Sequence, residues 1–293
     1  MSADLNELLK SKIINGWRLF WLVTTPISMV MVLTMTRVDL SSAEAISSLI
    51  QLAVRCAVPL LFLAFAASSF QAVFPGPFGR WLLRNRKYVG LCFAASMAWQ
   101  LLFILWLVGI HTEYYVSEVY VLSDVVEGVV GYALLIAMVL TSFKFGRSRL
   151  TPKQWKLLHK TGIYWLWIYA WSVYWFNLFY YDYDAVLLDY VYYWGGFVAW
   201  SLRMLAWARK RSRQSDSDGA RNALLMVSGI AAIVVGLSGS SFGAAWSPQV
   251  YEYLFGFSII ESLDSFMPYF PLVPFYPLFV ITFGAFLMVK SRG

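Results

Sequence analysis

The sequence predicts an all-α integral membrane protein, a polytopic bundle of about eight transmembrane helices. Hydrophobic residues make up 60% of the 293 positions and charged residues only 13%, whereas a soluble domain carries about 25% charged residues. Apolar segments of about 20 residues, the length that crosses the hydrocarbon core, recur along the chain. The polar stretches between them are too short to fold alone, so we expect one integrated membrane domain.

The apolar segments are placed in order along the chain. The first one, Leu19 to Met35, is too long for the hydrophobic part of a secretory signal and lacks a small-residue cleavage site, so we expect a retained span. The expected spans cover residues 15–36, 47–70, 88–110, 125–143, 157–177, 186–206, 223–242 and 272–289.

Charged residues separate to the two sides of these spans. Alternate connections hold 21 of the 23 Lys and Arg residues, and the other connections hold 12 of the 16 Asp and Glu residues. An excess of Lys and Arg marks the cytoplasmic side, which places both termini inside and requires an even number of spans. The net charge of +7 then reflects topology, so nucleic-acid binding is not expected. The organisation is a cytoplasmic segment at 1–14, six membrane helices within 15–206, a basic cytoplasmic loop at 207–222 and two additional helices within 223–293.

Local sequence signals support several of these elements. Thr151 can cap the fifth span, with Pro152 at its first helical position. The "PYFPLVPFYP" stretch predicts a broken or re-entrant entry to the last span. The seventh span carries a ridge of small residues that would let another helix approach closely, at Ser228, Ala232, Gly236 and Ser240.

Two stretches of the sequence resemble one known family. The first is "RNRKYVGL", which opens the third expected span, and the second is "PKQWKLLHKTGIYWLW", which opens the fifth. Both resemble the corresponding elements of the ferric reductase-like transmembrane domains. The branch resembled most is the bacterial heme-binding membrane subunit that partners a periplasmic methionine sulfoxide reductase. The similarity covers Ile46 to Ala206 and implies that 15–206 is a six-helix ferric reductase-like domain, beyond which the last two spans extend.

The resemblance implies a b-type heme between the third and fifth helices, which passes electrons from a quinol or flavin to an acceptor. Histidines from the facing helices hold the iron in that family. The third-helix ligand position falls on Gln100 and, for some members, a further one falls on Met97. The fifth-helix position falls on Ser172. Of the family's ligand positions, this chain keeps only His159.

The two histidines of this chain cannot share one heme in the predicted topology. His111 ends the third span on the outer side and His159 begins the fifth on the inner side, so nearly the membrane thickness of about 30 Å separates them. Met97 can offer a thioether, but it lies about two to three helical turns deeper than His159. A five-coordinate heme on His159 alone remains open. The His and Cys spacings indicate no other metal site.

Gln100 and Ser172 lie at matching depths in their spans, so we expect them to form a polar contact that replaces the ligand pair. The surrounding rings would fill the space that a porphyrin needs. An alternative is that this array relays electrons or stacks on a quinone. The rings in question are Trp165, Trp167, Tyr169, Trp171, Tyr174 and Trp175.

Two other polar residues each keep two interpretations. His159 is either a solvated contact at the membrane interface or a contact to heme or quinone. Arg55 lies within the second span, where an arginine is costly and usually has a partner. It either contacts an anionic cofactor group or quinone head, or extends to the outer interface.

We therefore expect a protein of the bacterial cytoplasmic membrane, surrounded by lipid and associated with a redox protein. The first hypothesis is a ferric reductase-like chain without heme or quinone, which acts as a non-catalytic interaction or assembly partner in a membrane redox system. The alternative is an electron-transfer subunit that uses heme b or quinone to supply a periplasmic acceptor. A small-solute transporter is a further alternative, although only the last span is interrupted as such folds require.

Overall fold

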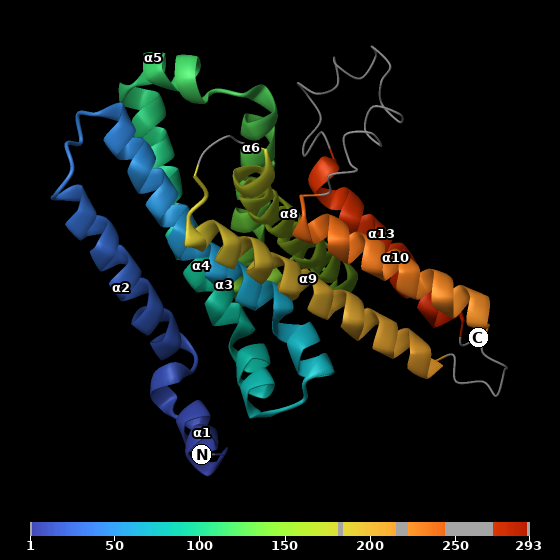
Figure 1. Ribbon diagram of the computed structural model, residues 1–293. Helices are drawn as coiled ribbons and strands as arrows, with labels where there is room; N and C mark the ends of the chain where they lie inside the picture. Colours follow the sequence, from blue (N-terminus) through green and yellow to red (C-terminus); the bar gives the residue numbers. More distant parts are fainter. Residues whose placement is uncertain (1, 181–183, 215–221, 244–271, 292–293) are drawn as a thin grey trace. The chain divides into compact units, whose positions relative to one another are not determined.

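Helices dominate the part of the chain that the structure describes, which comprises residues 2–180, 184–214, 222–243 and 272–291. This computed structural model contains no β-strand within those residues (Figure 1). The predicted all-α class is therefore confirmed. Every expected span corresponds to a helical segment: α2 (Trp17–Met35), α3 (Ala43–Val73), α4 (Pro77–Ile110), α6 (Leu122–Thr141), α8 (Pro152–Phe179), α9 (Leu187–Gln214), α10 (Ala223–Ser241), and η3 (Val273–Phe275) with α13 (Tyr276–Lys290).

Short helical turns lie at the start of the chain and between the long helices. They are α1 (Ser2–Lys10), η1 (Lys12–Ile14), α5 (Thr112–Tyr114), the π-helical turn η2 (Tyr115–Val119) and α7 (Lys144–Arg147).

Six helical segments are long and apolar enough to cross a membrane, namely α2, α3, α4, α6, α10 and Val273–Lys290. The chain is thus an integral membrane protein. Helices α8 and α9 have 28 residues each but are not among the six. Both are rich in Trp and Tyr, whose polar groups lower the hydropathy of a segment, and α9 ends in a basic stretch. The count of eight spans remains a prediction.

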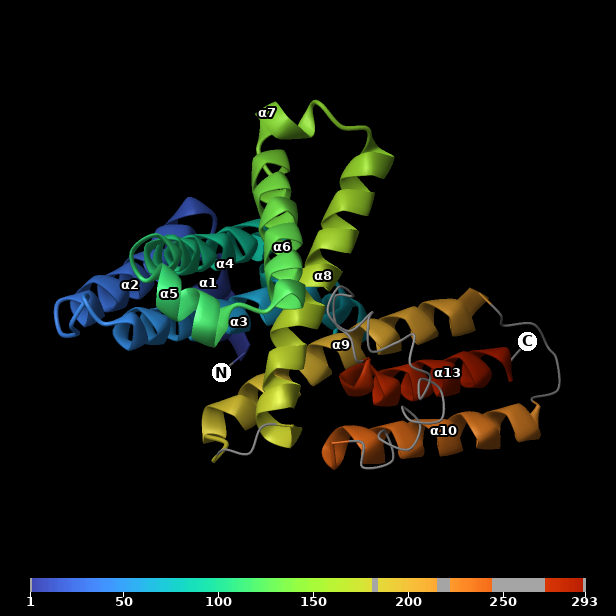
Figure 2. The same cartoon turned by 90° about the horizontal axis from the view of Figure 1, so that it is seen from above.

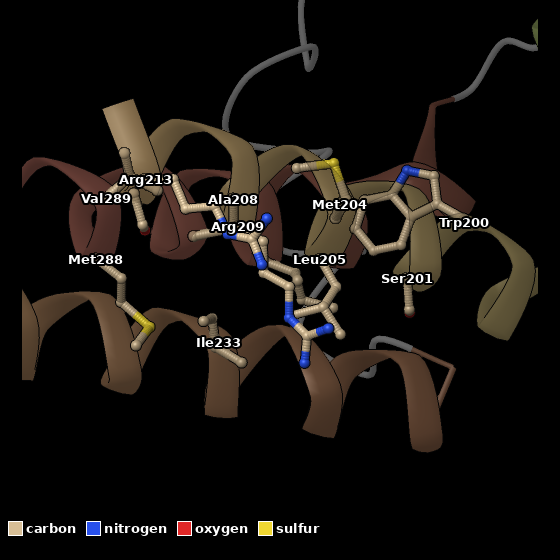
Figure 3. Close-up of a pocket in the computed structure, with 13 residues that line it drawn as sticks. Trp200, Ser201, Met204, Leu205, Ala208, Arg209, Arg213, Ile233, Met288 and Val289 are labelled. Atoms are coloured by element: carbon tan, nitrogen blue, oxygen red, sulfur yellow. The ribbon is translucent and has the colours of Figure 1, made fainter. Parts of the chain in front are cut away.

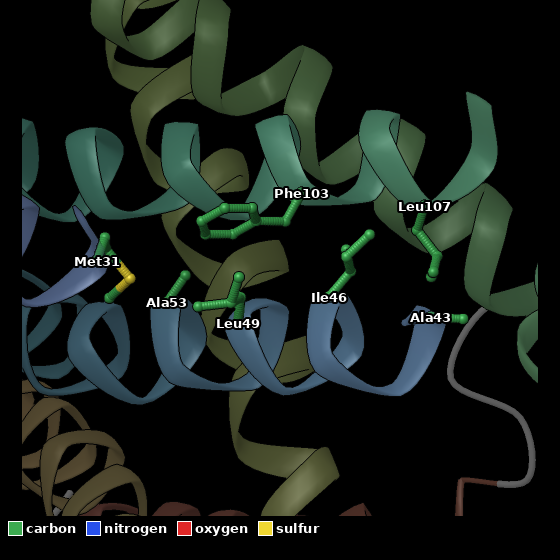
Figure 4. Packing of buried hydrophobic residues seen from close by; sticks show 7 residues of the cluster. All are labelled: Met31, Ala43, Ile46, Leu49, Ala53, Phe103 and Leu107. Atoms are coloured by element: carbon green, nitrogen blue, oxygen red, sulfur yellow. The ribbon is translucent and has the colours of Figure 1, made fainter. Parts of the chain in front are cut away.

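The chain divides into two compact units, residues 1–167 and 168–293, which are described separately. The first unit is built on the long antiparallel pair α3 and α4. Apolar residues at helical spacing meet between them, together with one residue from α2 (Figure 4). This fully or nearly buried cluster consists of Met31, Ala43, Ile46, Leu49, Ala53, Phe103 and Leu107.

Asn85 of α4 forms hydrogen bonds with the segment that precedes α2. Its side chain is 1% exposed and accepts a hydrogen bond from the Gly16 N–H at 3.0 Å, while its amide nitrogen donates to Asn15 Oδ1 at 2.8 Å. Arg84 also donates to Asn15 Oδ1 through Nε and Nη2. Gly16 has φ of 67° at the N-terminus of α2, a conformation that glycine adopts without steric cost. The polar network therefore fixes where η1 ends and α2 begins.

The second unit is built on α10 and α13, which lie side by side with α13 between α10 and α9 (Figure 2). A Cβ on Gly284 would lie 2.6 Å from the Gly229 carbonyl oxygen, and one on Gly236 would lie 2.7 Å from the Pro277 carbonyl. The close approach predicted for this helix is therefore present. Among its glycines, the close contacts with α13 are made by Gly229 and by Gly236, of which Gly236 belongs to the expected ridge.

The predicted start of the fifth span is confirmed, and the expected loop at 207–222 is corrected. Thr151 Oγ1 accepts from the Gln154 N–H at 3.3 Å, and α8 begins at Pro152. The described part of the proline-rich stretch forms the short turn η3 before α13 begins, and its first residues lie outside the described ranges. The expected loop at 207–222 is helical as far as Gln214, because α9 continues through its basic residues.

Substitution of Gly284 by alanine is expected to destabilise the α10–α13 pair by about 1–3 kcal/mol, since the added methyl group cannot fit against the Gly229 backbone. The matched control is Gly128→Ala on α6, where a Cβ would meet no atom within 4 Å. The control should be neutral or slightly stabilising, because alanine is the better helix former. Unfolding of both variants in detergent would be followed by circular dichroism, and equal stability of the two would contradict the close packing.

Substitution of Asn85 by leucine is expected to cost about 1–3 kcal/mol, because the Gly16 N–H loses its buried acceptor. The start of the chain should also separate from α4. Trypsin cleavage after Lys10 and Lys12 in the full chain would then become faster than in the parent protein. Gln51→Leu, an amide exposed on α3, is the control, and an unchanged cleavage rate in Asn85→Leu would show that the network does not hold this segment.

Candidate functional site

His159 lies in the second turn of α8, beside the end of α6. Its Nε2 atom is 3.0 Å from the Thr141 hydroxyl oxygen. That hydroxyl also lies 2.7 Å from the Ala137 carbonyl oxygen, and the imidazole tautomer decides which group donates in the His159–Thr141 bond. The imidazole is half-buried and its Nε2 is already engaged by the protein.

Trp155 completes this corner between α6, α7 and α8. Its indole N–H donates to the Thr141 carbonyl at 3.2 Å, and its ring centroid lies 4.3 Å from that of His159. The guanidinium of Arg147 lies 5.1 Å from the centre of the Trp155 ring and makes a cation–π interaction with it. The charges of Arg147 and Arg86 also act on the His159 ring. His159 is thus part of a packed helix corner with positive surroundings.

Gln100 is 8% exposed on α4 and contacts α6. The Tyr132 hydroxyl lies 2.8 Å from Gln100 Oε1 and 3.2 Å from the Met97 carbonyl oxygen, so it can donate to either acceptor. Sequence reasoning did not single out Tyr132, because the periodicity of α6 shows which face is apolar but not which residue across the interface it meets. At the expected third-helix ligand position there is therefore a polar contact within the first unit.

Ser172 is 5% exposed in the part of α8 that belongs to the second unit. Its hydroxyl donates to the Tyr169 carbonyl at 3.0 Å, within the same helix. The expected contact with Gln100 would join the two units, so it stays a prediction. Each of the two side chains has a hydrogen bond inside its own unit.

An aromatic group around Trp171 surrounds that part of α8. The Trp171 ring is fully buried and stacks on Tyr193 of α9 at 5.4 Å, and its indole N–H donates to the Tyr193 carbonyl at 3.2 Å. Tyr193 in turn donates its hydroxyl proton to the Ser240 carbonyl of α10 at 2.6 Å. The sequence identified Trp171 as part of an aromatic array but missed Tyr193, which connects three helices.

The remaining candidate residues are Met97 and Arg55. Met97 contributes its carbonyl oxygen to Tyr132, and Arg55 has an exposed side chain on α3, so both interpretations of Arg55 stay predictions. Asp189, which is 4% exposed at the start of α9, accepts hydrogen bonds from the Asn177 amide and from the Val186 N–H. Within the described ranges, no group of three His, Cys, Asp or Glu side chains is placed to hold a metal ion.

The Gln100–Tyr132 hydrogen bond is expected to couple the two residues by about 0.6 kcal/mol, and by up to about 1.7 kcal/mol, the range for such bonds between membrane helices. The measurement is a double-mutant cycle with Gln100→Leu, Tyr132→Phe and the double variant, unfolded in bicelles. Tyr120→Phe removes a hydroxyl from an exposed tyrosine and serves as the control, which should be additive with Gln100→Leu. Additivity of the Tyr132 pair would show that the hydrogen bond contributes nothing.

The comparisons with known proteins add no relative to this picture. Neither protein-family models, nor curated proteins, nor solved structures match this chain.

Proposed function

We propose that the chain is a ferric reductase-like membrane subunit whose heme-ligand positions have been replaced, and that it acts as a non-heme interaction or assembly partner in a membrane redox system. The observation that supports this most is the buried Gln100–Tyr132 hydrogen bond. A glutamine whose oxygen already accepts from a neighbouring helix stabilises the helix packing instead of holding an iron. The residues of "RNRKYVGL" and the His159 stretch carry the resemblance itself.

The environment of His159 supports the same proposal. Heme iron is bound by a ring nitrogen of histidine, and His159 Nε2 already makes a hydrogen bond with the Thr141 hydroxyl at 3.0 Å. Ligation through that atom would require the imidazole to leave Thr141. The ring would also lose its place against Trp155, which is fixed by its own bond to the Thr141 carbonyl.

An interaction role is supported by the helices that are little covered in their own unit. Only 17% of the residues in the most apolar stretch of α2 are buried, and 22% of those in the most apolar stretch of α6. Trp21 and Met29 on α2 are 62% and 61% exposed. Such faces suit lipid or the helices of a partner subunit. Because Lys and Arg are concentrated in alternate connections, we place both termini on the cytoplasmic side of a bacterial inner membrane.

The absorption spectrum of the purified full chain tests the proposal. We expect no Soret band, no stoichiometric pyridine hemochrome, and no difference spectrum after dithionite. Heme at one equivalent per chain would overturn the proposal in favour of the electron-transfer alternative. Ubiquinone that co-purifies with the parent, and is lost in His159→Ala or Arg55→Ala, would favour the quinone version of that alternative.

A gain of heme binding tests the resemblance independently. If the chain has the family's architecture, Gln100→His together with Ser172→His restores the two ligand positions, and we expect a Soret band when heme is added. The matched control is Gln100→His with Val173→His, whose second histidine stands one residue further on at an exposed position. Equal heme uptake by the two pairs, or none by either in folded protein, would count against the family assignment.

A further inference from the structure

The second unit contains a cleft that the proposed function does not use. It lies between α9, α10 and α13, and its volume is about 550 Å³ (Figure 3), within the usual range for ligand pockets. Gly229 and Gly284 bring α10 and α13 together, whereas α9 packs against α13 over a shorter stretch and also meets α10 through the Tyr193–Ser240 hydrogen bond. The side chains at the open junction do not fill the space that remains.

The cleft has an apolar wall and a basic edge. Ile233, Ile281 and Met288 line it from α10 and α13. The α9 side contributes Arg209 and Arg213, which are four residues apart and therefore share one face of the helix. Figure 3 shows both arginine side chains extending along the opening. The 13 described residues that line the cleft include these two arginines and no acidic residue.

We propose that this cleft binds an anionic phospholipid, with one acyl chain against the apolar wall and the phosphate at Arg209 and Arg213. Guanidinium groups pair well with phosphate oxygens, and basic pockets between membrane helices on the cytoplasmic side suit such headgroups. Along α9, the apolar lining residues Trp200, Met204 and Leu205 precede the two arginines, an order that matches the acyl chain and the headgroup of a lipid.

A lipid fits the cleft better than a soluble anion for two reasons. The apolar wall formed by Ile233 and Ile281 would contribute nothing to the binding of free phosphate. In addition, α10 has apolar side chains on its exposed surface, with Val227 and Val234 each 59% exposed. This face belongs to a helix that is apolar enough to cross a membrane, so a lipid can enter the cleft laterally from the bilayer.

The positive-inside rule explains why basic residues lie at this end of α9, but not why two of them line the cleft. Lys210 and Arg211 carry the same charge on the same turn of α9, yet they do not line the cleft. They therefore provide a matched control, because their removal changes the net charge equally without changing the cleft edge.

The experiment is a lipid titration of the full chain in detergent, with bound lipid counted by native mass spectrometry. Palmitoyl-oleoyl phosphatidylglycerol is the anionic probe and the phosphatidylcholine of the same chains is the zwitterionic one. The variants are Arg209→Gln/Arg213→Gln and the control Lys210→Gln/Arg211→Gln. A third variant, Ala208→Phe, places a ring in the cleft without changing charge.

We expect the parent to bind one phosphatidylglycerol more tightly than phosphatidylcholine. The Arg209/Arg213 variant should lose about 25-fold in affinity, since each basic residue beside an anionic lipid contributes roughly fivefold, and the Lys210/Arg211 variant should change less than threefold. Ala208→Phe should weaken binding with both arginines present. Equal losses in the two charge variants, equal binding of the two lipids, or unchanged binding in Ala208→Phe would overturn the proposal.

Discussion

The structure depends on one physical constraint, that a polar group within hydrocarbon must find its partner inside the protein. Hydroxyl groups on the membrane helices meet it by donating to the carbonyl one turn earlier, as Thr24 does to Phe20 and Thr282 to Leu278. Trp165 meets it across helices, since its indole N–H donates to the Glu127 carbonyl of α6. Because the acceptor is a backbone oxygen, this side chain both fills volume and helps to fix the position of the neighbouring helix.

The same constraint governs the positions where the resembled family places histidines. Gln100 and Ser172, which the resemblance places at two of those positions, are buried, so a polar side chain there needs a hydrogen bond within the protein. Gln100 bonds to Tyr132 of a neighbouring helix, and Ser172 bonds within its own helix. These two solutions differ in consequence. The Gln100 contact joins α4 to α6, whereas the Ser172 hydroxyl leaves the packing around it to the stacked rings of Trp171 and Tyr193.

Sequence periodicity and hydropathy located every long helix, and the capping residues placed the start of α8 correctly. They placed the start of α4 at residue 88 instead of Pro77, because Arg80, Arg84 and Arg86 lower the hydropathy of its first turns. Partner choice was not predictable. Tyr132 and Tyr193 are two among 18 tyrosines, and nothing in the spacing of a helix face states which carbonyl or amide it will meet. The site could be located by residue position, but its contacts required the packed structure.

Basic residues show why charge counting and packing answer different questions. Their concentration in alternate connections predicts which side of the membrane they occupy, and any arginine there would serve equally well. The structure gives these arginines separate tasks: Arg86 donates to the Ala64 carbonyl, Arg147 covers the Trp155 ring, and Arg209 borders the cleft of the second unit. An Arg→Lys exchange would preserve the topology in all three cases. It would remove the planar guanidinium group, which stacks on aromatic rings and forms paired hydrogen bonds. The charge of the side chain therefore determines its side of the membrane, and the shape of the guanidinium determines its contacts.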